Sequence, residues 1–557
     1  MPFNLLSDAW IPYRRHSGKI VWGPASMVTD LADGDPVMSI AAPRPDFGGA
    51  VQEFLIGLLS AVFEVQDEAK WRLLWISPPS PSALHDRFEA LAGAFNLDGD
   101  GPLFMQDVTV ADFSESDPVP IEQMLIDAPG EQTAKLNKDL FTKRGRVECL
   151  SRPAAAMALL TLQTYAPSGG QGHRTSMRGG GPLTTLVNPL GDNDGEGVPT
   201  ELSLWHKLWI NVSTVAQWKE LPGAGHKALS DKFPWLAPTR VSTKGSRATT
   251  AEDAHPLQAY FGMPRRIRLE FSGPGRCDLT GLEDEQTVTA FRTRNYGVEY
   301  TGWMHPLSPY YKTKETEPWL PVHGQPGGIS WRDWISLTFS QPAEALRRPA
   351  EVVARFKIDR ARSIKSREVR LHAFGYDMDN MKARGWVESQ RPLLLVDDAN
   401  VNHLLLDTAR TLSNATDLGA RELISAGKTA LFHRTEDARG DLSQYRSDVW
   451  DATESMFFDV MHRIASSNPD TVDVDVIKRA FLANLEVIVL GIFDRWCPMA
   501  AVPGENVARL VRARFTLINT FRGKSKAGGR LFEALGLPVP ESAAEKRGKK
   551  KRSKETA

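Results

Sequence analysis

Residues 477–492, IKRAFLANLEVIVLGI, contain the pattern that decides the fold of the C-terminal part of the chain. Apolar side chains recur there every three or four residues, the spacing of one face of an α-helix; they are Ile477, Phe481, Leu485, Ile488 and Ile492. A second face of this kind precedes it and consists of Trp450, Phe457, Met461 and Ile464. Both stretches predict long helices whose apolar faces pack against neighbouring helices.

Two further amphipathic stretches, residues 404–432 and 507–521, lie before and after these two, and turn-like breaks separate them. Short connections between long helices favour antiparallel neighbours. We therefore expect a four-helix bundle over residues 391–535. The end of the chain, residues 536–557, is rich in Lys and Arg and is expected to be a basic disordered tail, which either only solubilises the protein or makes non-specific phosphate contacts.

Residues 1–390 have a different texture, in which short strand-like and helical runs alternate with many Gly and Pro residues. Helices are expected over residues 54–65 and over residues 153–164, the second with Pro153 in its first turn. Residues 118–151 show no sustained period and predict a long loop. The fold class expected for the whole chain is α+β, with a large mixed N-terminal domain followed by the bundle.

Composition limits the classes of function. The 557 residues have a net charge of -1, whereas proteins that coat DNA alone are usually basic. Local basic patches can still bind DNA, especially where partner subunits contribute to the field. The three cysteines are scattered, the start lacks the features of a signal peptide, and no apolar run approaches the length of a membrane helix. We expect a cytoplasmic protein without disulfides, metal or cofactor.

The least ordinary stretch is the glycine segment, residues 168–181, SGGQGHRTSMRGGG, with six glycines in fourteen residues. Glycines permit positive φ and let backbone amides approach a ligand closely. Arg174 and Arg178 are expected to supply positive charge beside those amides. The alternative is a flexible surface linker, against which stands the strand-like run over residues 183–187 that follows directly.

Catalytic signatures are absent from the sequence, which contains no HExxH, GxSxG or kinase motif. Residues 523–525, GKS, resemble the end of a phosphate-binding P-loop, but Ile518 stands where the earlier glycine is required. Asp377 and Asp379 predict either a cation site or, with Lys382 and Arg384 nearby, a loop of balanced charge. A binding protein is favoured. A nucleotide-binding enzyme that uses the glycine segment and a purely structural scaffold are the alternatives.

Six short motifs, in order along the chain, together resemble the large subunit of the type I-E CRISPR Cascade complex, the CasA family. They are residues 4–12 (NLLSDAWIP), 43–46 (PRPD), 103–106 (LFMQ), 178–185 (RGGGPLTT), 302–309 (GWMHPLSP) and 375–384 (GYDMDNMKAR). The resemblance implies a non-catalytic subunit that works with the other Cascade subunits and CRISPR RNA. Such a subunit recognises the protospacer-adjacent motif in double-stranded DNA from the minor groove, promotes strand opening and recruits a helicase-nuclease.

The resemblance also assigns roles to residues. The DNA motif would be contacted by the glycine loop, Gly169, Gly170, Gln171 and Gly172, and by a basic finger at Arg292 or Arg294, where the family is known with Lys. A strand-separating wedge would consist of Asp379, Asn380 and Met381, with Asn380 where Gln is best known. The loop that docks near the 5′ handle of the guide would include Leu140, Phe141, Lys143 and Arg144. Because only Cys277 precedes the finger, the zinc site of some members is not expected.

Overall fold

A computed structural model describes residues 2–32, 34–109, 113, 116–130, 145–170, 172–191, 202–339, 346–362, 364, 368–379, 382–498 and 504–540. The chain divides into two compact units. Unit 1 comprises Met1–Gly328 and Ser336–Leu393, and unit 2 comprises Ile329–Ile335 and Leu394–Ala557. A mixed α+β region is thus followed by a helical bundle, which confirms the predicted fold class.

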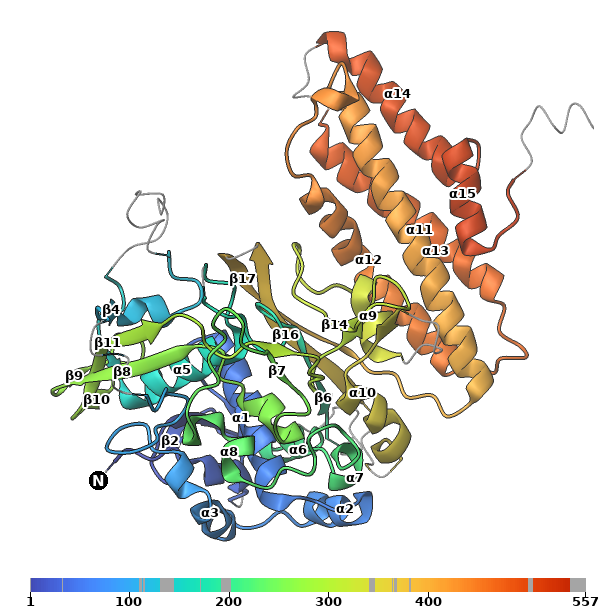
Figure 1. Ribbon diagram of the computed structural model, residues 1–557. Coiled ribbons are helices and arrows are strands. Elements are labelled where there is room, and N and C mark those ends of the chain that lie inside the picture. The colour runs from blue at the N-terminus through green and yellow to red at the C-terminus, as the bar shows by residue number, and fades with distance from the viewer. Residues whose placement is uncertain are drawn as a thin grey trace, which may run out of the picture. The chain divides into compact units, whose positions relative to one another are not determined.

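The strands of unit 1 form several small sheets, of which two carry the candidate site. In one, β11 (Thr287–Arg294) pairs antiparallel with β8 (Arg266–Ser272), β4 (Val119–Pro120) and β5 (Leu150–Ser151). In the other, β16 (Val369–Asp379) lies between β17 (Lys382–Pro392) and β6 (Thr184–Pro189). Strands β16 and β17 form the long hairpin visible in Figure 1.

The remaining strands of unit 1 are short. They are β1 (Ile11–Arg15), β2 (Ile20–Gly23) and β3 (Val37–Ile40) in one sheet, β13 (Tyr310–Tyr311), β14 (Leu320–Pro321) and β15 (Arg347–Arg348) in another, and the pairs β9 (Gly275–Arg276) with β10 (Glu283–Asp284) and β7 (Thr249–Thr250) with β12 (Tyr300–Thr301). The helices are α1 (Pro45–Phe63), α2 (Glu68–Ile76), α3 (Pro81–Glu89), α5 (Arg152–Tyr165), α6 (Leu204–Trp209), α7 (Val215–Trp218), α8 (Leu229–Lys232) and α10 (Glu351–Arg355).

Helix α1 is the centre of the unit 1 core. It begins at Pro45, earlier than the expected residue 54, because the extended Arg44 and the proline at the first helical position start the helix there. The Phe54 ring has edge-to-face contacts with four rings, those of Trp10, Phe95, Phe104 and Phe261. By length and composition α1 resembles a membrane-crossing helix, but 78% of its most apolar window is buried inside the protein, as in the core helix of a folded domain.

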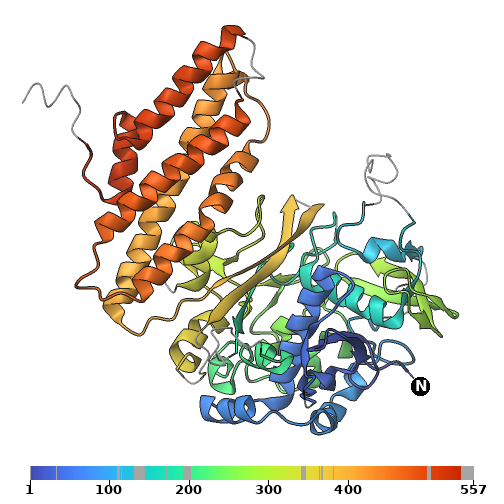
Figure 2. The same cartoon turned by 180° about the vertical axis from the view of Figure 1, so that it is seen from behind.

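Unit 2 is built from long helices that run side by side in both views (Figures 1 and 2). They are α11 (Ala399–Leu431), α12 (Ser443–Ala465), α13 (Val474–Trp496), α14 (Gly504–Phe521) and the shorter α15 (Lys526–Leu535), a helix not predicted separately. Trp331, at the start of α9 (Trp331–Thr338), stacks on Phe457 at 4.1 Å and donates a 2.9 Å hydrogen bond to the Trp450 carbonyl oxygen. The side chains predicted for one face of α12 therefore do line the core.

Candidate nucleic-acid interface

The first part of the glycine segment is an exposed turn between α5 and β6. Gly170 and Gly172 have φ of 88° and 79°, the left-handed region that glycine adopts without steric cost. The His173 N–H donates to the Gly170 carbonyl oxygen at 3.3 Å, which closes the turn. Gly169 and Gly170 are exposed, so the backbone of this turn is accessible to a ligand. Gln171 lies outside the described residues.

Gly172 joins this turn to the end of β11. Its carbonyl oxygen accepts a 2.7 Å hydrogen bond from the N–H of Tyr296, a residue that itself has a φ of 61°. A Cβ added to Gly172 would lie 2.7 Å from the Asn295 Cβ, closer than real Cβ atoms approach. The structure therefore brings the predicted glycine loop and the predicted finger together, although they are more than 100 residues apart in the sequence.

The two candidate finger arginines have different surroundings on β11. Arg292 forms an ion pair with Glu270 and donates hydrogen bonds to the carbonyl oxygens of Phe113 and Ser116, so it is tied into the fold. Arg294 is the last residue of the strand, is partly buried, and directly precedes the Asn295–Tyr296 pair that contacts Gly172. Of the two, Arg294 is nearer along the chain to Asn295 and Tyr296, the residues that contact the glycine loop.

Of the two arginines within the glycine segment, Arg178 does not supply the charge expected of it. Arg178 is only 4% exposed, and its guanidinium lies 2.5 Å from the Glu53 carboxylate. It also donates to the hydroxyls of Thr184 and Ser308, both at 2.9 Å. Sequence reasoning placed its charge beside a ligand, and this was wrong because a carboxylate 125 residues away in the sequence neutralises it.

Arg174 is likewise engaged with protein groups. It donates to the Ser242 hydroxyl at 2.7 Å and pairs with Glu299 at 3.0 Å. A positive charge that sequence reasoning missed lies beneath the loop instead. Arg265, 8% exposed, donates to the Pro167 carbonyl oxygen and contacts Gly169. The only sequence signal was a pair of arginines, Arg265 and Arg266, ahead of a strand.

The second part of the glycine segment packs against the β16–β17 hairpin. A Cβ added to Gly181, whose φ is 61°, would lie 2.7 Å from the Tyr376 Cβ and 2.8 Å from Met378 side-chain atoms. The Gly180 carbonyl oxygen is 2.8 Å from Nδ1 of His323. The glycine segment thus contacts the end of β11 through Gly172 and strand β16 through Gly181.

The predicted wedge belongs to this hairpin. Asp379 ends β16 and pairs with Lys382, which begins β17, while Asn380 and Met381 lie outside the described residues. Arg384 pairs with Asp377 at 2.7 Å and with Asp379 at 3.7 Å, which bears out the prediction of balanced charge. Leu140, Phe141, Lys143 and Arg144, of the predicted docking loop, also lie outside the described residues.

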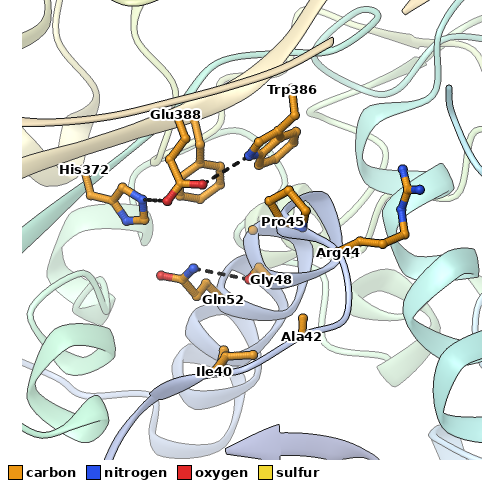
Figure 3. Close-up of a pocket in the computed structure, with 11 residues that line it drawn as sticks. Ile40, Ala42, Arg44, Pro45, Gly48, Gln52, His372, Trp386 and Glu388 are labelled. Carbon is orange, nitrogen blue, oxygen red and sulfur yellow. Dashed lines mark hydrogen bonds and ion pairs between the residues drawn. The ribbon is translucent and has the colours of Figure 1, made fainter. Parts of the chain in front are cut away.

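A pocket of about 140 Å³ lies at the base of the hairpin, where no site residue was predicted (Figure 3). The Glu388 carboxylate is 2.9 Å from Nε2 of His372 and accepts a 3.3 Å hydrogen bond from Nε1 of Trp386. Gln52 and Pro45 of α1 face these side chains from the opposite wall. The His372–Glu388 contact links the two strands of the hairpin, and the Tyr376 hydroxyl of β16 anchors the hairpin to α1 by donating a 2.6 Å hydrogen bond to the Asp46 carboxylate.

Among the described residues no group of three His, Cys, Asp or Glu side chains is arranged to hold a metal ion. Cys149, Cys277 and Cys497 are free thiols. Residues 523–525, which resemble part of a P-loop, lie between α14 and α15, and the Ser525 hydroxyl caps α15 by accepting the Gly528 N–H at 3.0 Å. Ser525 is therefore a helix cap, and the residues around it do not form a phosphate-binding loop.

This chain is similar to known proteins along almost its whole length. Residues 4–492 match the family model described as CRISPR-associated protein Cse1. The crystal structure of Thermobifida fusca Cse1 is similar, with 16% identity and a TM-score of 0.68 over 96% of this chain and 98% of that chain. That of Acidimicrobium ferrooxidans Cse1 has 17% identity and a TM-score of 0.63 over 97% and 99%. A chain described as a CRISPR RNA-guided surveillance complex has 16% identity and a TM-score of 0.66 over 93% and 99%.

Proposed function

We propose, from the premise that this chain belongs to the CRISPR-associated protein Cse1 family, that it reads the motif flanking a target in duplex DNA and begins to open the duplex. It would do so as a non-catalytic subunit of a CRISPR RNA-guided surveillance complex, the description carried by one similar structure. One observation carries this proposal. The glycine segment contacts the end of β11 through Gly172 and the β16–β17 hairpin through Gly181.

This arrangement suits motif reading from the minor groove. In RNA-guided recognition the guide reads the target by base pairing, and the protein reads only a short flanking motif. The minor groove offers a degenerate pattern of acceptors and donors, which suits the acceptance of several related motifs. The exposed turn at Gly169 and Gly170 brings backbone within reach of the groove, and Arg294 would supply the side-chain donor.

Duplex opening would follow at the hairpin. The glycine segment contacts strand β16 through Gly181, and the tip of the same hairpin would insert between the first base pairs once the motif is bound. Apolar side chains act in this way in other minor-groove proteins, where they enter between base steps and unstack them. Asp379, Asn380 and Met381 are the proposed wedge, with Met381 as the apolar group.

The remaining partners follow from the same proposal. Leu140, Phe141, Lys143 and Arg144 would dock against the guide-bearing subunits, and the open complex would recruit the helicase-nuclease that degrades the target. No cofactor is required for these steps, and the cytoplasm is the proposed compartment.

The test compares the complete complex with one that lacks this chain. Binding is measured to a duplex that carries the motif and to a matched duplex in which the motif is scrambled. We expect the complete complex to prefer the motif-bearing duplex and the incomplete complex to lose that preference. Equal preference in both complexes would leave the chain as a structural scaffold. Nucleotide binding by the isolated chain, which we expect to be absent, would support the enzymatic alternative.

A further inference from the structure

Tyr376 on β16 is a point at which three other parts of unit 1 meet. The side chain is buried, and its hydroxyl donates a 2.6 Å hydrogen bond to the Asp46 carboxylate on α1. A Cβ added to Gly181 of the glycine segment would lie 2.7 Å from the Tyr376 Cβ, and the Tyr165 ring of α5 lies edge-on to the Tyr376 ring at 6.2 Å. Because Tyr376 lies three residues before Asp379, its position decides where the proposed wedge begins.

The Asp46 carboxylate is a fixed acceptor for this hydroxyl. It is 1% exposed, and Arg44 donates to its two oxygens at 3.0 Å and 3.2 Å. Arg44 also pairs with Asp127 at 2.8 Å, so the carboxylate has a cationic partner that is itself held in place. Burial and the Asp46 charge raise the pKa of the Tyr376 hydroxyl, which therefore stays protonated and remains a donor. Arg44 and Asp46 both belong to the motif at residues 43–46, and these contacts place that motif beside the hairpin.

Glu53 holds the glycine segment to the same helix. Its carboxylate, 2% exposed, lies 2.5 Å from the Arg178 guanidinium and accepts 2.6 Å hydrogen bonds from the hydroxyls of Tyr165 and Thr184. Asp46 and Glu53 are seven residues apart on α1, which puts them on one side of the helix and about 10 Å apart along its axis. The glycine segment and the hairpin are thus fastened to one buried helix.

The spacing of these two segments matters because duplex opening begins without help from the guide. Separation of the first base pairs costs free energy, and pairing with the guide compensates only afterwards. A hairpin that had to be ordered at that moment would add an entropy cost of its own, whereas a hairpin held in place beforehand adds none. If the hairpin is in position for only a fraction of the time, the rate of opening falls by that fraction.

We propose that Asp46 and Glu53 are positioning residues, which hold the hairpin and the glycine segment at one spacing along α1. A duplex bound through its motif then meets residues 379–381 at its first base pairs. This inference rests on the proposed function and adds the groups that link its two steps. Because both carboxylates are buried, they act through Tyr376 and Arg178 and not by contact with DNA. Loss of the bond between Asp46 and Tyr376 should therefore impair opening and leave motif reading intact.

The first experiment replaces Tyr376 by Phe in the complete complex, which removes the hydroxyl and keeps the buried ring. Motif preference is measured as the ratio of affinities for motif-bearing and scrambled duplexes, and opening as the rate of R-loop formation on motif-bearing linear duplex. We expect an unchanged ratio and an opening rate lower by roughly three- to tenfold, the factor that corresponds to the net contribution of one hydrogen bond. The rate should return nearly to that of wild type when mismatches pre-melt the first pairs.

A second variant, Tyr165→Phe, tests the link to Glu53 independently. The Tyr165 ring lies against both strands of the hairpin, at 6.2 Å from the Tyr376 ring and 5.3 Å from the Trp386 ring, and its hydroxyl ties it to Glu53. Arg178 remains paired with Glu53 in this variant. We therefore expect the same result as for Tyr376→Phe, with motif preference unchanged and opening slowed on linear duplex.

Tyr13→Phe is the matched control, because the Tyr13 hydroxyl is also buried and donates to the Pro24 carbonyl oxygen at 3.0 Å in the separate β1–β2–β3 sheet. It should lower the thermal unfolding midpoint of the isolated chain about as much as Tyr376→Phe and leave opening unchanged. Normal opening in either hairpin variant, an equal defect on linear and pre-melted duplex, or the same slowing by Tyr13→Phe would overturn the inference. A wild-type complex without motif preference would instead contradict the proposed function, whatever the variants do.

Discussion

The carbonyl oxygen of Gly172 accepts a 2.7 Å hydrogen bond from the N–H of Tyr296, two residues beyond Arg294. This bond links a glycine-rich turn to the end of a strand from a distant part of the sequence. Both partners have positive φ, so the contact depends on backbone conformations that most residues adopt only with strain. Because Gly172 makes this contact and Gly170 does not, substitutions at these two glycines should weaken target binding to different degrees.

Replacement of Gly172 by Val should break this link. The added Cβ would meet Asn295 at 2.7 Å, and the positive φ adds about 1 to 3 kcal/mol of strain. Gly170→Val meets no atom within 4 Å and suffers only the strain. We expect both complexes to assemble, with target binding weakened more by Gly172→Val than by Gly170→Val.

Gly245 provides the matched control, since its φ is 90° and its Cβ side is also open, but it lies outside the glycine segment. Assembly is followed by size-exclusion chromatography and target capture by gel shift. If Gly172→Val and Gly245→Val bound target equally well, the glycine segment would be a linker and not a reading loop.

Arg294 is the finger residue that we predict to read the motif. Arg294→Ala should relax discrimination between motifs by about 1 to 3 kcal/mol, the usual value of a base contact. Arg292→Ala removes the partner of Glu270 and two hydrogen bonds to carbonyl oxygens, so it should lower stability instead. Competition binding among several motif sequences measures discrimination, and thermal unfolding measures stability. Loss of discrimination in Arg292→Ala alone would exchange the two assignments.

The helical part of the fold was predictable because helix periodicity is a local property. The apolar faces around Trp450 and Ile477 follow from side chains three and four residues apart, and no distant contact is needed to recognise them. The hairpin was not predicted as such. Its strands pair with each other and with β6, and the sequence of residues 375–384 gave only a charged, loop-like pattern.

The site was predictable only where glycine itself carries the signal. Gly170 and Gly172 adopt positive φ, the conformation for which glycine is chosen. The roles of the nearby arginines could not be predicted in the same way, because the sequence around Arg178 and around Arg265 does not show which of them has an acidic partner in the fold. Only tertiary structure reveals that Glu53 neutralises Arg178 and that, within the described residues, Arg265 has no carboxylate partner.

Two buried histidines should make the protein sensitive to acid. His255 and His305 each precede a proline, and Nδ1 of each accepts the N–H of the leucine that follows, at 3.1 Å. Burial lowers the pKa of His255 from 6.5 to about 4 and that of His305 well below 6.5. The folded protein therefore keeps them neutral, whereas the unfolded chain binds protons below pH 6.5.

The free energy of unfolding should consequently fall as the pH drops from 6.5 toward 4, by up to about 1.4 kcal/mol per pH unit for each histidine. His255→Asn keeps an acceptor for the Leu257 N–H but cannot titrate, so its stability should depend less steeply on pH. Urea unfolding at several pH values measures this slope. Equal slopes for wild type and variant would mean that His255 is protonated in the folded state as well.

The wedge prediction concerns the rate of duplex opening. Separation of the first base pairs costs on the order of 1 to 2 kcal/mol per stacking step, and guide pairing compensates only afterwards. Residues at the tip of the β16–β17 hairpin should therefore act on nucleation and not on the finished hybrid. Asn380→Ala combined with Met381→Ala should slow R-loop formation on linear duplex, less so on negatively supercoiled DNA, and hardly at all when mismatches pre-melt the first pairs.

Arg384→Ala, which alters the stem of the hairpin by removing the partner of Asp377, separates loss of hairpin shape from loss of the tip side chains. The rates are measured on the three substrates at one salt concentration. An equal defect of the tip variant on all three would place Asn380 and Met381 in general DNA affinity or in folding, and the hairpin tip would no longer be a wedge.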